Sequence, residues 1–256
     1  MIHNTAIIDK SAVIGKDVNI GPYAVIGESV VIGDGTSVGA HAVIEFAEIG
    51  KNCKIFPQSS IGAAPQDLKY AGEKTKAVIG DGTTVREFAT INRGTVASGQ
   101  TVVGKNCLIM TCAHIAHDCI VGDNVILANC CAVAGHVEVG DGVVMGGFSG
   151  SHQFTKIGKN VIVGAGSMIA MDIIPYTQAQ GDRAKLFGLN LIGLKRKRVP
   201  IAEIENIKHA YKILFASKLP LENAVAKLEE ELSSSLYVQD ILNFIKRSQR
   251  GLVRPK

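Results

Sequence analysis

An aliphatic residue followed by glycine recurs at six-residue spacing near the start of the chain. The first run comprises Ile14, Ile20, Ile26, Ile32 and Val38. The register slips by one residue before Ile49, and from Val103 to Ile169 every sixth residue is apolar except Ser151. A helix with 3.6 residues per turn cannot keep every sixth residue on one face, whereas a solenoid can, because each hexad supplies one short strand and one turn. The repeat therefore predicts a parallel β-helix.

The interior of such a solenoid must be filled by small and aliphatic side chains. Aromatic residues make up only 5% of the 256 residues and Trp is absent, which suits a narrow, regular core. Four of the six cysteines lie four residues after an aliphatic repeat position, namely Cys53, Cys107, Cys119 and Cys131. We expect these four to fill space in a reduced interior, with neither a disulfide nor a metal cluster. Cys112 and Cys130 lie one place earlier and receive no role.

Two segments depart from the repeat, at residues 63–77 and 94–100. Insertions into a solenoid emerge as surface loops, where function is often located. The repeat ends near Asp172, an irregular segment containing TQAQGDRAKLFG follows, and helices are predicted over residues 200–217, 220–232 and 238–249. We therefore predict two domains: a β-helix over residues 1–186 and a helical domain over residues 187–256 that covers the open edge of the last coil.

The chain shows no pattern typical of export or of membrane insertion. No basic region precedes an apolar stretch near the N-terminus, and no uninterrupted apolar run reaches the length of about 18 residues that a bilayer requires. We expect a cytoplasmic protein with no integral membrane segment and no nucleic-acid partner. The formal net charge is only +4, but basic residues are concentrated at Lys195–Arg198. This run predicts either a solvated helix face or contact with an anionic partner.

Four histidines lie in or beside irregular hexads, namely His114, His117, His136 and His152. If three hexads form one coil, stacked positions are eighteen residues apart, and His136 follows His117 by nineteen residues. These side chains should therefore gather along one edge, where a neutral imidazole can act as a base near neutral pH. Asp118 could raise the basicity of His117, but adjacent residues on a strand point to opposite faces, so its role stays open. A zinc site across a subunit boundary is the alternative.

The loop at residues 63–77 contains PQDLKYAGE, in which Gln66, Asp67 and Lys69 offer an amide, a carboxylate and an ammonium group. Such a trio suits a sugar phosphate, whose hydroxyl groups donate to the carboxylate and whose phosphate attracts the ammonium. Ordinary polar loops share this composition, so these residues alone do not identify a substrate.

Several segments between the hexads are more distinctive than the hexads themselves. They are PQDLKYAGE, INRGTV at 91–96, AHIAHDC at 113–119, LANCCAVAGHVEVGD at 127–141, HQF at 152–154 and FGLNLIGLKR at 187–196. Together they resemble the UDP-N-acetylglucosamine O-acyltransferase family over nearly the whole chain. The resemblance implies transfer of a 3-hydroxyacyl group from acyl carrier protein to the sugar 3-hydroxyl at the start of lipid A biosynthesis, without a cofactor or metal. It also implies a left-handed β-helix, a C-terminal α-helical domain, and a homotrimer with active sites between subunits.

The resemblance also implies a role for individual residues. His117 matches the general base, and the backbone N–H of Gly135 matches the group that stabilises the oxyanion. Other matches are His114, His136, His152 and Gln153 beside the sugar or acyl chain, Gln66, Asp67 and Lys69 at the sugar nucleotide, Asn190 and Arg196 of a neighbouring subunit, and Ala165 as the residue that limits acyl length. The small side chain of Ala165 implies a fairly long acyl chain. The family commonly has Glu two residues after the Asn, whereas this chain has Ile192, which removes a carboxylate contact to the nucleotide.

Three other functions are compatible with the repeat. A different hexapeptide acyltransferase would use acyl-coenzyme A or another amino sugar, and an acceptor with a 3-amino group fits the same residues. A zinc-dependent hydratase would use histidines as ligands, and a non-catalytic scaffold would need none of them. The PQDLKYAGE loop and the full-length resemblance favour the acyltransferase of lipid A biosynthesis.

Overall fold

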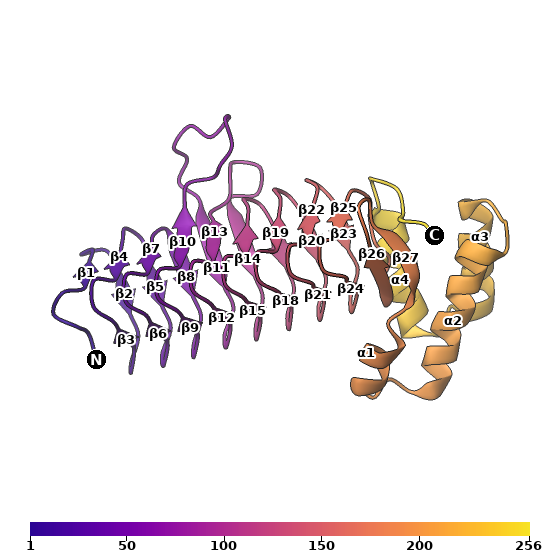
Figure 1. The fold of residues 1–256 in the computed structure, drawn as a ribbon, viewed down its shortest axis with the longest axis horizontal. Coiled ribbons are helices and arrows are strands. Elements are labelled where there is room, and N and C mark those ends of the chain that lie inside the picture. Colours follow the sequence, from indigo (N-terminus) through magenta and orange to yellow (C-terminus); the bar gives the residue numbers. More distant parts are fainter.

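The computed structural model describes residues 1–256 and shows a solenoid of short strands that ends in a group of helices (Figure 1). Three sheets of nine, eight and ten strands run along it. The first sheet contains β1 (Ile7–Ile8), β4 (Val25–Ile26), β7 (Val43–Ile44), β10 (Ser60–Ala63), β13 (Thr90–Asn92), β16 (His114–Ile115), β19 (Ala132–Val133), β22 (Gly150–Ser151) and β25 (Met168–Ile169). The second contains β2 (Val13–Ile14), β5 (Val31–Ile32), β8 (Ala47–Ile49), β11 (Lys76–Ile79), β14 (Gln100–Val103), β17 (Ile120–Val121), β20 (Glu138–Val139) and β23 (Lys156–Ile157). The third contains β3 (Asn19–Ile20), β6 (Ser37–Val38), β9 (Lys54–Ile55), β12 (Thr84–Val85), β15 (Leu108–Ile109), β18 (Ile126–Leu127), β21 (Val144–Met145), β24 (Ile162–Val163), β26 (Thr177–Gln180) and β27 (Lys185–Leu189).

Strands of neighbouring coils pair in parallel and in register. Ile115 of β16 pairs with Val133 of β19, eighteen residues later, and both side chains are fully buried. The two inserted loops lengthen two coils, so that Ile61 pairs with Ile91 and Ile91 with Ile115. Each hexad therefore supplies one strand and one turn, and three hexads close one coil.

The apolar core runs along the solenoid and includes the expected cysteines. Cys53, Cys107, Cys119 and Cys131 are all buried, as predicted for residues that fill space in the interior. Burial raises the pKa of Cys119 to about 12, so its thiol stays protonated. Cys112 and Cys130 are exposed in turns.

The segment after the last coil is more regular than predicted. TQAQGDRAKLFG was expected to be irregular, but it forms most of β26 and β27, an antiparallel pair that extends the third sheet beyond β24. Thr177 and Ala179 of β26 alternate with Gln178 and Gln180, which gives the strand one buried side. The predicted domain boundary after residue 186 falls inside β27, because this pair continues the sheet of the solenoid.

Four helices follow: α1 (Leu191–Arg196), α2 (Ile201–Ala216), α3 (Leu221–Leu232) and α4 (Leu236–Arg247). Pro200 and Pro220 directly precede α2 and α3, as predicted from their fixed backbone geometry. The short helix α1 was not predicted, because six residues are too few for a helical period. None of the helices has the length and apolar character that crossing a membrane requires.

After α4 the chain returns to the solenoid and attaches to the buried side chain of Asp172. The Asp172 carboxylate accepts hydrogen bonds from the backbone N–H of Gln249 and Arg250 and from the Ser248 hydroxyl, at 2.7 to 3.2 Å. Val253 N–H also donates to the carbonyl oxygen of Asp172 (2.8 Å). The C-terminal tail is thus joined to the end of the β-helix.

Candidate active site

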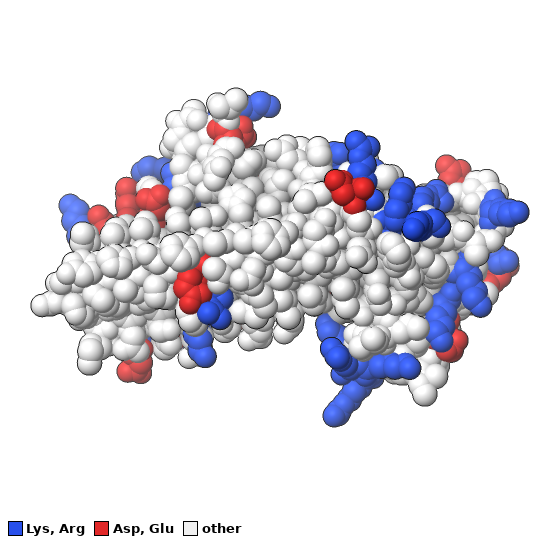
Figure 2. All heavy atoms as spheres, viewed as in Figure 1, with Lys and Arg blue, Asp and Glu red and all other residues white.

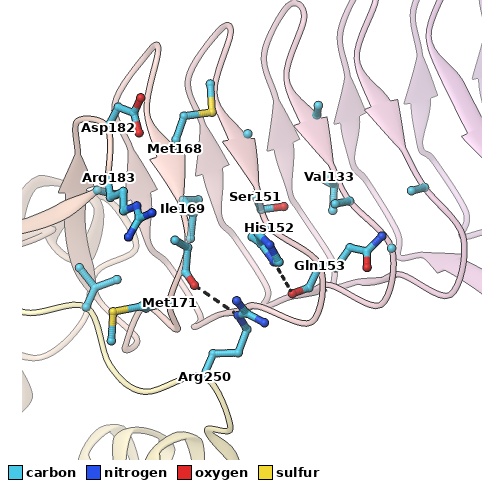
Figure 3. A pocket seen from close by; sticks show the side chains of 18 of the residues that line it. Val133, Ser151, His152, Gln153, Met168, Ile169, Met171, Asp182, Arg183 and Arg250 are labelled. Carbon is cyan, nitrogen blue, oxygen red and sulfur yellow. Dashed lines mark hydrogen bonds between the residues drawn. The ribbon is translucent and has the colours of Figure 1, made fainter.

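A pocket of about 960 Å³ runs beside β16, β19, β22 and β25 as far as the C-terminal tail. Its first end is lined by His114, Ala116 and His117, with Gln66 from the loop at residues 63–77. Apolar groups and Met side chains line much of the remainder, and basic side chains lie at the far end (Figure 3). The residues of this second half include Val133, Ile169, Met168, Met171, Arg183 and Arg250.

His117 and Asp118 form a buried pair at the first end of the pocket. Nδ1 of His117 lies 2.7 Å from Oδ2 of Asp118, and neither side chain is more than 6% exposed. Asp118 has a φ of 59°, so it occupies a corner turn rather than a strand. The alternation of side chains along a strand therefore does not apply, and the contact that the sequence left open is made.

Hydrogen bonds surround the carboxylate of Asp118. Thr95 donates from its backbone N–H to Oδ1 (2.9 Å) and from its hydroxyl to Oδ2 (2.7 Å), and the hydroxyl of Ser98 donates to Oδ1. Burial by itself raises the pKa of Asp118, but the hydrogen bonds from Ser98, His117 and Thr95 outweigh it and lower the pKa to about 2. An ionised carboxylate can only accept hydrogen bonds, so Nδ1 of His117 carries the proton. Nε2 is then free to accept one.

The backbone of Gly135 lies directly against the His117 ring. A Cβ at Gly135 would lie 2.7 Å from Nε2 of His117, so only glycine fits beside this imidazole. The N–H of Gly135 donates to no acceptor within the chain. A free N–H next to the base is available to a developing negative charge.

The other predicted histidines surround this pair. The His136 ring meets the His117 ring edge-on, with centroids 5.1 Å apart, and stacks on Phe154 at 4.5 Å. Nδ1 of His114 lies 2.7 Å from the hydroxyl of Thr90. Burial and then the nearby His117 lower the pKa of His114, which keeps its imidazole neutral. His114, His117, His152 and Gln153 line the pocket and His136 contacts His117, so the predicted clustering of the four histidines along one edge is present.

Six of the predicted site residues do not line the pocket of this chain. They are Asp67, Lys69, His136, Ala165, Asn190 and Arg196. The carboxylate of Asp67 accepts a hydrogen bond from Lys69 N–H (3.0 Å) and so shapes the loop that carries Gln66. Asn190 is buried, caps α1 by accepting from Gly193 N–H (2.9 Å), and donates to the carbonyl of Asn160. Ala165 and Arg196 are exposed on other parts of the surface.

His117, Asp118 and His136 could together present ligand atoms to a metal, since these atoms lie within 4.8 Å of one another. Both oxygens of Asp118 already accept hydrogen bonds from Thr95, and Ser98 and His117 add two more. This arrangement fits an orienting carboxylate better than a metal ligand.

Thr95 and Ser98 are site residues that were not predicted. They lie in the inserted segment at residues 94–100, and they contribute through hydrogen bonds to Asp118 rather than by facing the pocket. The break in the repeat was the available signal, but residue type alone does not indicate which turn residue a hydroxyl will reach.

Comparison with known proteins gives the same family for several parts of the chain. Residues 172–253 match the profile described as Udp N-acetylglucosamine O-acyltransferase, domain 2, and residues 100–135 match the bacterial transferase hexapeptide (six repeats). Residues 1–106 match a profile described as GMPPB C-terminal domain.

Two relatives that share one name match 99% and 80% of the chain. The acyl-[acyl-carrier-protein]–UDP-N-acetylglucosamine O-acyltransferase of Thermodesulfovibrio yellowstonii is 48% identical over 255 residues, which is 99% of each chain. The protein of that name from Myxococcus xanthus is 45% identical over 207 residues, 80% of each chain. The crystal structure of UDP-N-acetylglucosamine O-acyltransferase from Moraxella catarrhalis has a TM-score of 0.97 at 44% identity and covers 99% of both chains.

These similarities confirm the predicted fold class, a left-handed parallel β-helix of hexapeptide repeats with a C-terminal α-helical domain. The identity extends over both the solenoid and the helices, so it is not a property of the repeat alone. This chain belongs to the acyl-[acyl-carrier-protein]–UDP-N-acetylglucosamine O-acyltransferase family.

Proposed function

We propose that this chain transfers a 3-hydroxyacyl group from acyl carrier protein to the 3-hydroxyl of UDP-N-acetylglucosamine, the first step of lipid A biosynthesis. The observation that carries the proposal is the buried His117–Asp118 pair at one end of a long, partly apolar pocket. An oriented imidazole beside a channel for an alkyl chain suits acylation of a sugar hydroxyl. Full-length similarity to enzymes named for this reaction supports the same conclusion.

His117 acts as the general base in this proposal. Its Nε2 takes the proton of the sugar hydroxyl while that oxygen bonds to the thioester carbonyl carbon, and ionised Asp118 stabilises the resulting imidazolium. The Gly135 N–H then donates to the negative oxygen of the tetrahedral intermediate. Collapse of the intermediate breaks the C–S bond, and the imidazolium gives its proton to the departing thiolate, which leaves as the thiol of the carrier. The acyl ester remains on the sugar.

Basic side chains in the C-terminal half suit an acidic carrier protein. Figure 2 shows Lys and Arg side chains gathered over the C-terminal part, whereas the coils on this face carry few charges. Arg183, Lys185, Arg250 and Arg254 line the far end of the pocket, and Lys195–Arg198 lie at α1. Clusters of this sign speed association with an oppositely charged partner and lose strength in salt.

The active site is completed by a neighbouring copy in a homotrimer. Many outward-facing residues of the strands are apolar and exposed, including Ile7, Val13, Val31 and Val43, and contact with another copy would bury such side chains. The resemblance assigns Asn190 and Arg196 to the sugar nucleotide of a neighbouring subunit, in keeping with their distance from the pocket of their own chain. It assigns Ala165 to the end of the acyl groove.

Replacement of the base tests this function directly. His117→Ala should lower turnover of UDP-N-acetylglucosamine with 3-hydroxyacyl carrier protein by about two to four orders of magnitude, the usual contribution of a positioned acid or base. Product formation is measured by mass spectrometry, and thermal unfolding should be nearly unchanged. His209→Ala is the matched control, because His209 is exposed and contacts Glu231 on the helical part. Retention of more than about a tenth of the wild-type rate by His117→Ala would contradict the assignment.

A further inference from the structure

The loop at residues 63–77 brings Gln66 to the pocket but contains no helix or strand between β10 and β11. It leaves the coil at Gly62, whose φ of 84° and close approach to the Glu45 carbonyl leave no space for a Cβ. A segment without regular structure holds one conformation only when contacts offset its backbone entropy. Asn92 donates to Ala64 and Thr75 donates to Gly94 at the two ends of the loop, and the Arg93 side chain between them contacts both limbs.

The side chain of Arg93 joins both limbs of the loop to the coil. Nη1 donates to the carbonyl of Gly62 where the loop begins (2.8 Å). Nε and Nη2 both donate to the Tyr70 hydroxyl in the outer limb, at 3.1 and 2.7 Å. The Tyr70 hydroxyl in turn donates to the carbonyl of Glu73 (3.0 Å). One guanidinium therefore fixes the segment on either side of Gln66.

The surroundings of Arg93 require a planar, charged group. Only 11% of its side chain is exposed, and Cζ lies over the rings of Phe46 and Tyr70, 4.5 and 5.4 Å from their centroids. Nη1 also lies 3.6 Å from a carboxylate oxygen of Glu45. A lysine ammonium provides neither the plane that stacks on two rings nor donors directed toward both limbs.

The same segment of chain also contacts the catalytic pair. The N–H of Arg93 donates to the carbonyl of Ala63 (3.0 Å), and two residues later Thr95 donates twice to the carboxylate of Asp118. Residues 93–95 thus contact the loop through Arg93 and contact Asp118, which orients His117, through Thr95. The position of Gln66 relative to His117 is set through this short connection.

We propose that Arg93 is a positioning residue that holds the sugar-nucleotide loop at a fixed place relative to His117 and so determines affinity for the nucleotide sugar. The inference rests on the proposed function, since it takes the loop to bind UDP-N-acetylglucosamine. Arg93 itself contacts no substrate. Substitution of Arg93 should therefore weaken binding of the acceptor, UDP-N-acetylglucosamine, and leave binding of the acyl donor and the rate of the chemical step unchanged.

Steady-state kinetics of two variants test this inference. Arg93→Lys keeps the positive charge but loses the planar guanidinium with its several donors. Tyr70→Phe removes only the hydroxyl that accepts two hydrogen bonds from Arg93. Each should raise KM for UDP-N-acetylglucosamine by roughly ten-fold or more, as expected for loss of a charge-assisted hydrogen bond. The kcat, its pH dependence and KM for the acyl carrier protein should change by less than about three-fold. Limited proteolysis should cut the loop faster in both variants.

Arg86→Lys is the matched control. Arg86 also lies over an aromatic ring, that of Phe56 at 4.4 Å, and pairs with Glu87, but it contacts no part of the loop. Unchanged acceptor KM in both test variants, or an equal fall in kcat at saturation with both substrates, would overturn the inference. Absence of turnover by the wild-type chain would instead refute the proposed function, and the proteolysis comparison would still report whether Arg93 holds the loop.

Discussion

At the scale of single residues, the contact between Gly135 and His117 determines how the base is presented. The imidazole cannot retreat from a new side chain, because its Nδ1 is bonded to Asp118. Gly135→Ala should displace the ring and lower turnover by about two to three orders of magnitude, the range for loss of an oxyanion donor or a misplaced base. Because the φ of Gly135 is not positive, alanine imposes no backbone strain there.

Turnover measured beside calorimetric binding of UDP-N-acetylglucosamine checks the Gly135 prediction. Binding should persist while turnover falls. A turnover rate of Gly135→Ala within about three-fold of the wild-type rate would contradict the prediction, because it would mean that the His117 ring can accommodate the added methyl group.

The low pKa of Asp118 has a consequence for stability. The pKa of Asp118 in the folded chain, about 2, lies below the ordinary value of 3.8. At a pH above 3.8, ionised Asp118 therefore stabilises the folded chain, and this stabilisation is lost as the pH falls from 3.8 through the folded-state pKa. The difference in unfolding free energy between wild type and Asp118→Asn should therefore be largest at neutral pH and shrink as the pH falls from 3.8 towards 2. Denaturant titrations at several pH values measure it, and a difference that stays constant across this range would contradict the assignment.

Individual site residues were predictable only where the repeat marks them. The four histidines were found because they interrupt hexads, and eighteen-residue stacking correctly brought His136 to His117. The contact of Asp118 was not predicted, because side chains alternate along a strand whereas Asp118 lies in a turn of positive φ. Arg93 gave no signal, since its burial depends on how a loop folds back over it.

At the scale of elements, Asp172 connects the last coil to the C-terminal tail. Oδ1 of Asp172 accepts from Lys156 N–H and Oδ2 from the N–H groups of Gln249 and Arg250, so in Asp172→Asn the amide nitrogen must face one of these donors. We expect the free energy of unfolding to fall by about 1 to 3 kcal/mol, the cost of buried groups left without partners. Hydrogen exchange of residues 248–253 should also become faster.

Asp17→Asn is a suitable control for Asp172, because Asp17 is an exposed turn residue. Thermal unfolding and amide exchange of the two variants are compared side by side. Equal protection of the tail in wild type and Asp172→Asn would show that other contacts hold it.

The elements themselves followed closely from sequence periodicity. Two-residue strands appear at the hexad positions, and the three long helices lie within a few residues of their predicted bounds. The pair β26 and β27 was missed because only the exposed edge of β24 makes that segment a strand. An edge supplied by distant residues is not visible in local composition.

At the scale of the whole molecule, the site is expected to be shared between copies. Light scattering should give a mass three times that of one chain. His117→Ala and Arg196→Ala each remove a different contribution to one site. We expect each variant alone to be impaired, and when the two chains are unfolded together and reassembled, about a quarter of the sites should combine intact His117 with intact Arg196 from another copy.

Activity that appears in the reassembled mixture but in neither variant alone would show that the site is shared between copies. A mixture as inactive as its components would place both residues in a site within one chain. A mass equal to that of one chain would exclude the shared site altogether.

The in-register stacking of coils has a consequence for how such a molecule can change length. An insertion of eighteen residues adds one coil and leaves every inward side chain facing inward. An insertion of one residue turns the inward side chains of all later residues outward, unless a corner absorbs the extra residue. The hexad before Ile49 is one residue short, and the turn between β7 and β8 absorbs this change in the same way. Whole coils can therefore be added to or removed from the chain, whereas single-residue insertions and deletions are tolerated only at the corners. Residues that must meet across coils, such as His117 and Gly135, keep their distance only while the register between them is intact.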